Sequence, residues 1–138
     1  MLTKIEALKT IFSALSSREE LYQKIMEWGK RLPPLNTSSK KEENRVIGCQ
    51  SLMYLCSDYK ENAIYFYAAS DALISAGLAA LLVEVYSGET PETILTTPPI
   101  FLEELGIPSA LSPGRANGLA SLYLKLRQEA VKYLNFSK

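Results

Sequence analysis

Apolar residues at intervals of three or four positions predict helices near both ends of the chain. Near the N-terminus the series is Ile5, Leu8, Ile11/Phe12 and Leu15, and near the C-terminus it is Leu119, Leu122, Leu126 and Tyr133. Thr3-x-x-Glu6 has the spacing of a capping box, in which both side chains accept hydrogen bonds from unpaired backbone N–H groups. Ser112-Pro113 is a helix-start signal. We therefore expect a first helix that begins near Thr3 and a long last helix that ends at about Leu134.

The middle of the chain predicts further helices. Ser16/Ser17 with Glu19/Glu20 marks a second start, and Gly29 with Leu32-Pro33-Pro34 marks its end. The segment 72–86 is apolar nearly all round, which indicates a buried central helix capped by Ser70 or Asp71. Thr90-Pro91 begins a short helix that ends before Thr96, and another helix runs over 99–105.

Two strand-like runs, 51–57 and 63–69, flank the polar segment 58–62 and predict an antiparallel hairpin. Alternation places the side chains of Ile64, Phe66 and Ala68 on one face of the second strand. The polar residues 36–45 are expected to form an exposed loop. The sequence therefore predicts one α+β domain over residues 1–138, with a small antiparallel sheet covered by several helices.

Composition excludes several classes of active site. The 138 residues contain no histidine, so the chain cannot supply an imidazole base, a Ser-His-Asp triad or a histidine metal ligand. Its two cysteines are too few for a disulfide-rich scaffold or a four-thiolate cluster. Fifteen Lys and Arg balance fifteen Asp and Glu, which argues against nucleic-acid binding.

No apolar run approaches the roughly 20 residues that cross a bilayer, and the first residues lack the apolar core of a signal peptide. We therefore expect a cytoplasmic protein that binds no membrane.

Cys49 lies where the polar loop meets the first predicted strand, beside Gly48, which removes side-chain bulk. A thiol at such a junction can be exposed or retracted by a small loop movement. On composition alone, a lone cysteine is more often a small apolar residue of a core, and that alternative stays open here.

The residues around Cys49 resemble the V-x-G-C-Q-S-x-V-W-L block of the SufE family. This chain reads Val46-Ile47-Gly48-Cys49-Gln50-Ser51 followed by Leu52-Met53-Tyr54-Leu55. Four further segments resemble family patterns in the same order: Tyr22 to Pro33 with Gly29-Lys30, Ser70-Asp71-Ala72 with Gly77-Leu78, Tyr86-Ser87-Gly88-x-Thr90-Pro91, and Leu111-Ser112-Pro113-x-Arg115-x-x-Gly118-Leu119. Three positions depart from the pattern: Tyr54 replaces Trp, Ala76 replaces a basic residue, and Gly114 replaces a small hydroxyl residue.

The resemblance implies a SufE/IscU-like fold and a sulfur-transfer function. Cys49 would accept sulfane sulfur from the persulfide of a SufS-like cysteine desulfurase, stimulate that enzyme, and relay the sulfur to an iron–sulfur cluster assembly scaffold. It implies no cofactor and no metal, and we expect a monomer or weak homodimer. The chain would be a sulfur carrier rather than a stand-alone enzyme.

Five residues are expected to support Cys49. Gly48 permits close approach to the thiol, while Gln50 and Ser51 hold the loop by hydrogen bonds to the backbone. Arg115 is the candidate for orienting or stabilising the sulfur anion, although a surface or capping salt bridge is its alternative role. Asp71 is expected to cap the central helix, with coupling to Arg115 or control of the Cys49 loop as alternatives.

Two other functions remain open from sequence. The chain could be a regulatory adaptor that binds a desulfurase or scaffold without transferring sulfur. Alternatively, Cys49 and Cys56 could hold iron or zinc across a dimer. Alternation along the first strand favours a buried structural role for Cys56, and its separation from Cys49 along an extended strand makes a disulfide between them awkward.

Overall fold

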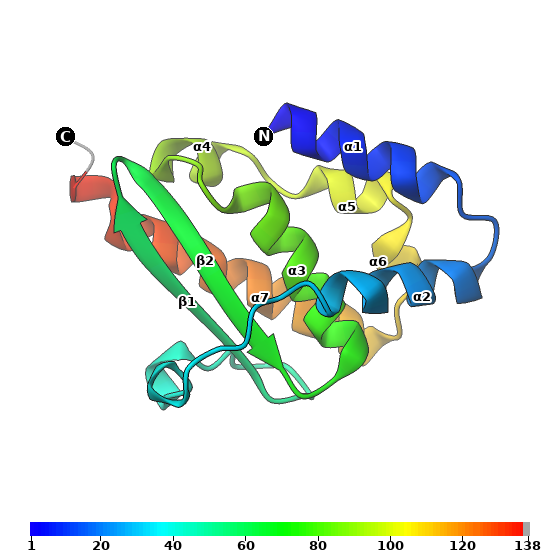
Figure 1. The fold of residues 1–138 in the computed structure, drawn as a ribbon, viewed down its shortest axis with the longest axis horizontal. Coiled ribbons are helices and arrows are strands. Elements are labelled where there is room, and N and C mark those ends of the chain that lie inside the picture. Colours follow the sequence, from blue (N-terminus) through cyan, green and yellow to red (C-terminus); the bar gives the residue numbers. More distant parts are fainter. Residues whose placement is uncertain (137–138) are drawn as a thin grey trace.

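The computed structural model describes residues 1–136, in which helices cover one face of a two-stranded antiparallel sheet (Figure 1). The elements are α1 (Leu2–Ser13), α2 (Arg18–Gly29), β1 (Met53–Lys60), β2 (Ala63–Ser70), α3 (Leu73–Tyr86), α4 (Pro91–Thr96), α5 (Ile100–Glu104), α6 (Ile107–Ala110) and α7 (Pro113–Lys132). Short 3₁₀ turns occupy Thr37–Ser39, Glu42–Asn44 and Leu134–Phe136. The predicted α+β class is confirmed.

The hairpin pairs Met53 with Ser70 at one end and Lys60 with Ala63 at the other. Its two turn residues, Glu61 and Asn62, have φ values of 52° and 65°. Two positive φ values match the right-handed twist of the flanking strands. The side chains that point toward the helices are buried, as expected for β2: Met53, Leu55, Ile64, Phe66 and Ala68.

β1 begins two residues later than predicted and ends three residues later. The apolar run from Ser51 suggested an earlier start, but the N–H of Leu52 donates to Asp71 Oδ1 at 3.0 Å instead of joining the strand ladder. Ser51 and Leu52 therefore remain in the loop that precedes β1. That loop carries Cys49.

Three of the predicted helix starts are confirmed by side-chain caps. Ser17, Thr90 and Ser112 accept hydrogen bonds from backbone N–H groups in the first turns of α2, α4 and α7. The predicted capping box at Thr3 is wrong, because α1 already begins at Leu2 and Met1 precedes it without a side-chain cap. The predicted caps of α3 are also wrong: its N-cap is Ala72.

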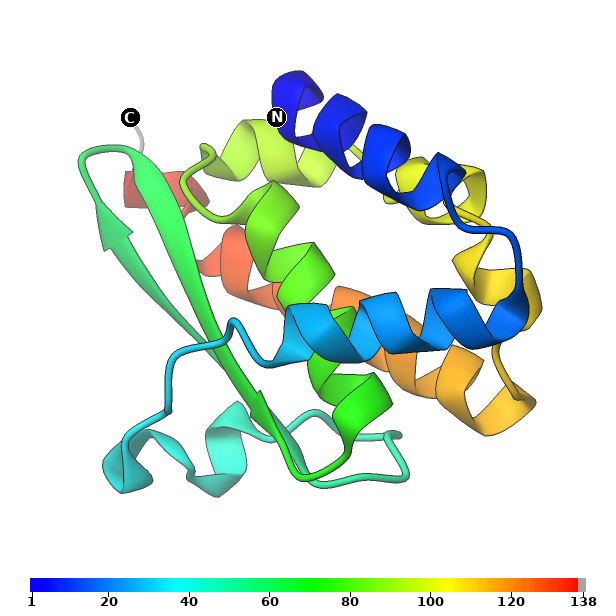
Figure 2. The ribbon, with the colours of Figure 1, turned by 45° about the vertical axis from the view of Figure 1, so that its right-hand side comes forward.

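α3 is the buried central helix that the sequence predicted, lying between α2 and the sheet (Figure 2). Gly77 brings α3 against α2, because a Cβ there would overlap the carbonyl group of Ile25. A Cβ on Gly29 of α2 would lie 2.8 Å from the backbone nitrogen of Gly77. The two glycines thus allow the two backbones to touch.

The last third of the chain differs from expectation in its details. α6 was not predicted, and it follows Gly106, whose φ is 77°. α7 ends at Lys132, so Tyr133 lies beyond it, half-buried and stacked on Tyr59 with the ring centroids 5.1 Å apart. The residues 36–45 form the expected, largely exposed connection, although two 3₁₀ turns lie within it. Within residues 1–136, no helix has the length and apolarity that a membrane span requires.

Candidate functional site

Cys49 lies in a loop, residues 47–52, whose base is held closed by backbone hydrogen bonds. Val46 N donates to Met53 O at 2.9 Å, just before and just after the loop. Leu52 and Asp71 exchange two hydrogen bonds, from Leu52 N to Asp71 Oδ1 at 3.0 Å and from Asp71 N to Leu52 O at 3.1 Å. The base is therefore fixed to β1 and to the end of β2, and Cys49 lies at the tip.

The tip of the loop packs against small residues of α7. Gly48 has a φ of 92°, and a Cβ there would lie 2.6 Å from Ser121 Oγ. A Cβ on Gly118 would lie 3.2 Å from Cys49 Sγ. Both glycines thus allow the loop backbone and the sulfur to approach the helix, which explains why Gly48 precedes the cysteine.

Gln50 continues the same contact one turn earlier along α7. A Cβ on Gly114 would lie 2.5 Å from Gln50 Oε1. The loop therefore runs antiparallel to α7, with residues 48, 49 and 50 lying over 121, 118 and 114 in turn. The sequence motif included Gly118, but no role was assigned to it. Gly114 and Gly118 are four residues apart, which places both on one face of a helix, and this spacing could have indicated a surface for close packing.

A Gly118→Ala substitution is expected to push the Cys49 sulfur off α7. The new methyl group would meet Sγ at 3.2 Å, closer than carbon and sulfur normally pack. We expect Cys49 to be alkylated several-fold faster, measured by mass spectrometry of the Cys49 peptide. Gly114→Ala is the matched control, because its methyl group meets only the end of the flexible Gln50 side chain. Equal alkylation rates in the two variants would contradict this contact.

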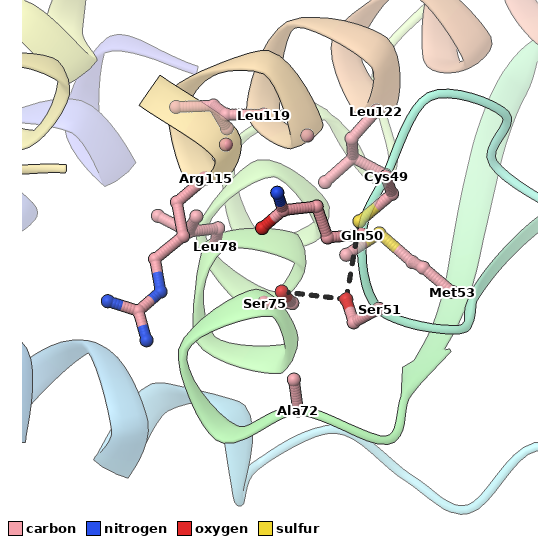
Figure 3. Close-up of a pocket in the computed structure, with 12 residues that line it drawn as sticks. Cys49, Gln50, Ser51, Met53, Ala72, Ser75, Leu78, Arg115, Leu119 and Leu122 are labelled. Atoms are coloured by element: carbon pink, nitrogen blue, oxygen red, sulfur yellow. Dashed lines mark hydrogen bonds between the residues drawn. The ribbon is translucent and has the colours of Figure 1, made fainter. Parts of the chain in front are cut away.

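A cavity of ≈ 230 Å³ opens beside Cys49 between the loop, α3 and α7 (Figure 3). Its lining residues are Cys49, Gln50, Ser51, Met53, Ala72, Ser75, Leu78, Gly114, Arg115, Gly118, Leu119 and Leu122. Four of the predicted site residues, Cys49, Gln50, Ser51 and Arg115, are thus brought to one cavity. Cys49 itself is half-buried, so its sulfur is neither fully enclosed nor fully exposed.

A chain of serine hydroxyl groups leads from the sulfur toward α3. Cys49 Sγ lies 3.3 Å from Ser51 Oγ, which donates a hydrogen bond to Ser75 Oγ at 2.9 Å. Ser70 Oγ donates to Ser51 Oγ at 3.4 Å. The predicted hydrogen bonds from Ser51 and Gln50 side chains to the backbone are therefore wrong within residues 1–136: Ser51 bonds side chains, and Gln50 packs on Gly114. Sequence reasoning missed Ser75 entirely.

Arg115 lines the cavity, but its guanidinium points away from Cys49 (Figure 3). It lies over the ring of Tyr22, 5.7 Å from the centroid. Arg18, which donates to the Tyr22 hydroxyl at 3.1 Å, is the main cause that holds the pKa of Tyr22 below its ordinary value, and Arg115 adds to it. Within residues 1–136, no carboxylate lies within 4 Å of Arg115, so the guanidinium forms no ion pair there.

Asp71 holds the loop base instead of capping α3. Its carboxylate accepts from Leu52 N, and α3 has no side-chain cap. The expected capping role is therefore wrong. Of the three roles that the sequence left open, control of the Cys49 loop is the one that these contacts favour.

Cys56 lies on the face of β1 that points away from the helices. The predicted buried role of Cys56 is wrong: Cys56 alternates with the buried Met53 and Leu55, so it lies on the opposite face and is only half-buried. Burial is the main cause that raises the pKa of the Cys56 thiol, and the nearby Asp58 carboxylate raises it further. At neutral pH the Cys56 thiol is therefore a poor source of thiolate.

Cys49 and Cys56 are both free thiols; Cys49 lies in the loop before the hairpin and Cys56 lies on β1. In the part of the chain that the structure describes, no three His, Cys, Asp or Glu side chains gather in a group that could hold a metal ion.

Family comparison agrees with the fold. Residues 6–130 match the family model described as SufE: Fe-S metabolism associated domain, so the chain belongs to the SufE family. It is similar in fold to the solution structure of a hypothetical protein from Thermus thermophilus, with a TM-score of 0.79 and 27% identity over 96% of each chain.

Two curated relatives differ in how much of their own length this chain covers. It is 31% identical to the sulfur acceptor protein CsdE of Escherichia coli, covering 85% of this chain and 81% of that one. It is 36% identical to the chloroplastic/mitochondrial SufE-like protein 1 of Arabidopsis thaliana, covering 95% of this chain but only 35% of that longer protein. The similarity thus extends over nearly all of this chain in both cases.

Proposed function

We propose that this protein accepts sulfane sulfur on Cys49 from the persulfide of a cysteine desulfurase. The observation that carries the proposal is the position of Cys49, half-buried at the tip of a loop whose base is fixed and whose tip packs against α7 through small residues. Family membership and the sulfur-acceptor name of the E. coli relative support the same function.

The transfer step is a thiolate exchange on a persulfide. The Cys49 thiolate attacks the outer sulfur of the desulfurase persulfide, the S–S bond of that persulfide breaks, and the desulfurase sulfur leaves as a thiolate. Cys49 then carries the outer sulfur as its own persulfide. No electrons enter or leave overall, so the step needs no redox cofactor.

The surface of the loop suits a partner that approaches Cys49. Ile47 and Leu52 flank the cysteine in the sequence and are 72% and 41% exposed. Apolar side chains at such exposures lower the free energy of a complex when they become buried at an interface. The cavity beside Cys49 then receives the persulfide once the partner has dissociated.

We also propose that the protein stimulates the desulfurase and passes the sulfur on to an acceptor. Transfer restores the enzyme's free thiol, so the protein stimulates turnover, and the Cys49 persulfide delivers its outer sulfur to an iron–sulfur cluster scaffold. We propose that the protein does so in the cytoplasm as a monomer or weak homodimer. Gly48, Gln50 and Asp71 shape the loop, and Ser51 and Arg115 act on the sulfur or on its partner.

Sulfur loading tests the proposal directly. The protein is incubated with a cysteine desulfurase and free cysteine, and its mass is measured under non-reducing conditions. We expect a gain of one sulfur atom on the peptide that contains Cys49. A gain on Cys56 alone would overturn the site assignment. Binding to the desulfurase with no gain of sulfur would support the regulatory adaptor instead.

Arg115→Ala is expected to slow sulfur acceptance several-fold without unfolding the protein. Arg115 is exposed, lines the cavity and forms no ion pair within residues 1–136, so its guanidinium can turn from the Tyr22 ring toward an incoming sulfur anion or a partner carboxylate. Single-turnover loading kinetics measure the change. Arg31→Ala is the control, because Arg31 stacks on Trp28 at 3.9 Å and does not line the cavity. Transfer kinetics like those of the control would remove Arg115 from the mechanism.

A further inference from the structure

Three serine hydroxyls from different segments form a cluster, and one of them, Ser51, contacts the Cys49 sulfur. Ser51 belongs to the loop, Ser70 to the end of β2 and Ser75 to the first turn of α3. Ser51 is the centre of the cluster, 3.3 Å from Cys49 Sγ, 2.9 Å from Ser75 Oγ and 3.4 Å from Ser70 Oγ. The dashed lines in Figure 3 show the first two contacts. Within residues 1–136, no side-chain oxygen or nitrogen other than Ser51 Oγ forms a hydrogen bond with the sulfur.

The cluster can serve either protonation state of Cys49. A hydroxyl has one hydrogen and two acceptor lone pairs, and its hydrogen rotates to suit its neighbours. When Cys49 is a thiol, its S–H donates to Ser51, and Ser51 donates to Ser75. When Cys49 is an anion, the Ser51 hydrogen turns to the sulfur, and Ser75 and Ser70 donate to the two lone pairs of Ser51. No member loses its partners in either arrangement.

The backbone orients one end of this hydroxyl chain. Ala72 N donates to Ser70 Oγ at 3.3 Å, which leaves the hydrogen of Ser70 available for Ser51. When Cys49 is an anion and Ser51 turns its hydrogen from Ser75 to the sulfur, the donors run in one direction, from Ala72 through Ser70 and Ser51 toward the sulfur. Successive hydrogen bonds of this kind polarise one another, so the Ser51 hydroxyl becomes a stronger donor to an anion.

No charged side chain among the residues that line the cavity contacts the Cys49 sulfur in place of Ser51. α7 contributes Arg115, whose guanidinium points away from the sulfur, and the segment after β2 contributes Asp71, whose carboxylate accepts from Leu52 N. The residues of α3 that line the cavity, Ser75 and Leu78, are neutral. A hydrogen bond to an ionised group is about twice as strong as one between neutral groups, so a donor at Ser51 favours the anion over the thiol.

We propose that the Ser51 hydroxyl is the donor that stabilises the Cys49 sulfur anion, in place of the arginine that the sequence suggested. The anion is the thiolate that attacks the desulfurase persulfide, so this inference rests on the proposed function and assigns its anion-stabilising group. In the anionic state Ser51 turns its hydrogen from Ser75 to the sulfur, and Ser70 and Ser75 donate to the two lone pairs of Ser51.

The pH dependence of Cys49 alkylation tests Ser51 without any desulfurase. Iodoacetamide reacts with the thiolate, and mass spectrometry of the Cys49 peptide separates its rate from that of Cys56. We expect Ser51→Ala to be alkylated about tenfold more slowly than wild type at neutral pH, since one lost hydrogen bond to a charged group is worth about one decade of thiolate population. Above about pH 10, where an ordinary thiol is ionised, the two rates should converge.

Ser51→Thr is the matched variant, because it keeps the hydroxyl and should stay close to wild type throughout. Equal rates for Ser51→Ala and wild type at neutral pH would overturn the proposal. So would a change by the same factor at every pH, which would mean that Ser51 acts only on loop structure. Sulfur loading of the wild-type protein is measured separately: its failure would end the proposed function, whereas a flat alkylation result would end only the role of Ser51.

Discussion

A Cys49→Ser variant is expected to accept no sulfur at all while it remains folded. Serine is close in size to cysteine, and Cys49 is half-buried on a loop outside the hydrophobic core, so the substitution removes the nucleophile with little change in packing. A hydroxyl is far too weakly acidic to attack a persulfide at neutral pH. The measurement is the mass of the protein after incubation with desulfurase and cysteine, together with a circular dichroism spectrum that confirms the fold.

Cys56 is not expected to replace the missing nucleophile. Burial and Asp58 raise the pKa of its thiol, and a thiol with a raised pKa is protonated at neutral pH. Its contribution should appear only as the pH rises above the ordinary range of a cysteine. Cys56→Ser is therefore the matched control, and it should load sulfur as wild type does. Loading of Cys49→Ser at neutral pH would contradict the assignment of Cys49.

The sequence predicted the fold well where local chemistry decides it. Ser17, Thr90 and Ser112 cap helices as expected, because a hydroxyl just before an amphipathic run satisfies N–H groups that nothing else can reach. The same signal failed at Thr3 and Asp71. At Asp71 a tertiary partner, Leu52 N, competes for the carboxylate, and no local pattern reveals that partner.

The candidate site was predictable in its nucleophile but not in its surroundings. The motif around Cys49 is contiguous, so a resemblance could identify it. Ser75 lies 24 residues beyond Ser51 and meets it only because α3 folds back beside the loop. The direction of the Arg115 side chain depends on Tyr22, which comes from the opposite end of the chain. Such contacts are set by tertiary packing, which a single sequence does not display.

Gly77→Ala is expected to destabilise the protein more than Gly118→Ala or Gly106→Ala does. The added Cβ would overlap the Ile25 carbonyl group, and a backbone atom cannot rotate away as a side chain can. α2 must then separate from α3, the helix that carries Ser75 and packs against the sheet. We expect the free energy of unfolding to fall by about 3 kcal/mol, although alanine has the higher helix propensity by about 1 kcal/mol.

The test compares the urea unfolding midpoints of Gly77→Ala and Gly106→Ala. The second variant shows the general effect of adding a methyl group, so the difference between the two midpoints reports the close contact between α2 and α3. Gly106 has open space around its Cβ position, so its substitution costs only the strain of a positive φ, about 1 kcal/mol. Equal midpoints for the two variants would show that α2 and α3 do not touch at Gly77. Because α3 also positions the cavity beside Cys49, we expect any folded fraction of Gly77→Ala to load sulfur more slowly as well.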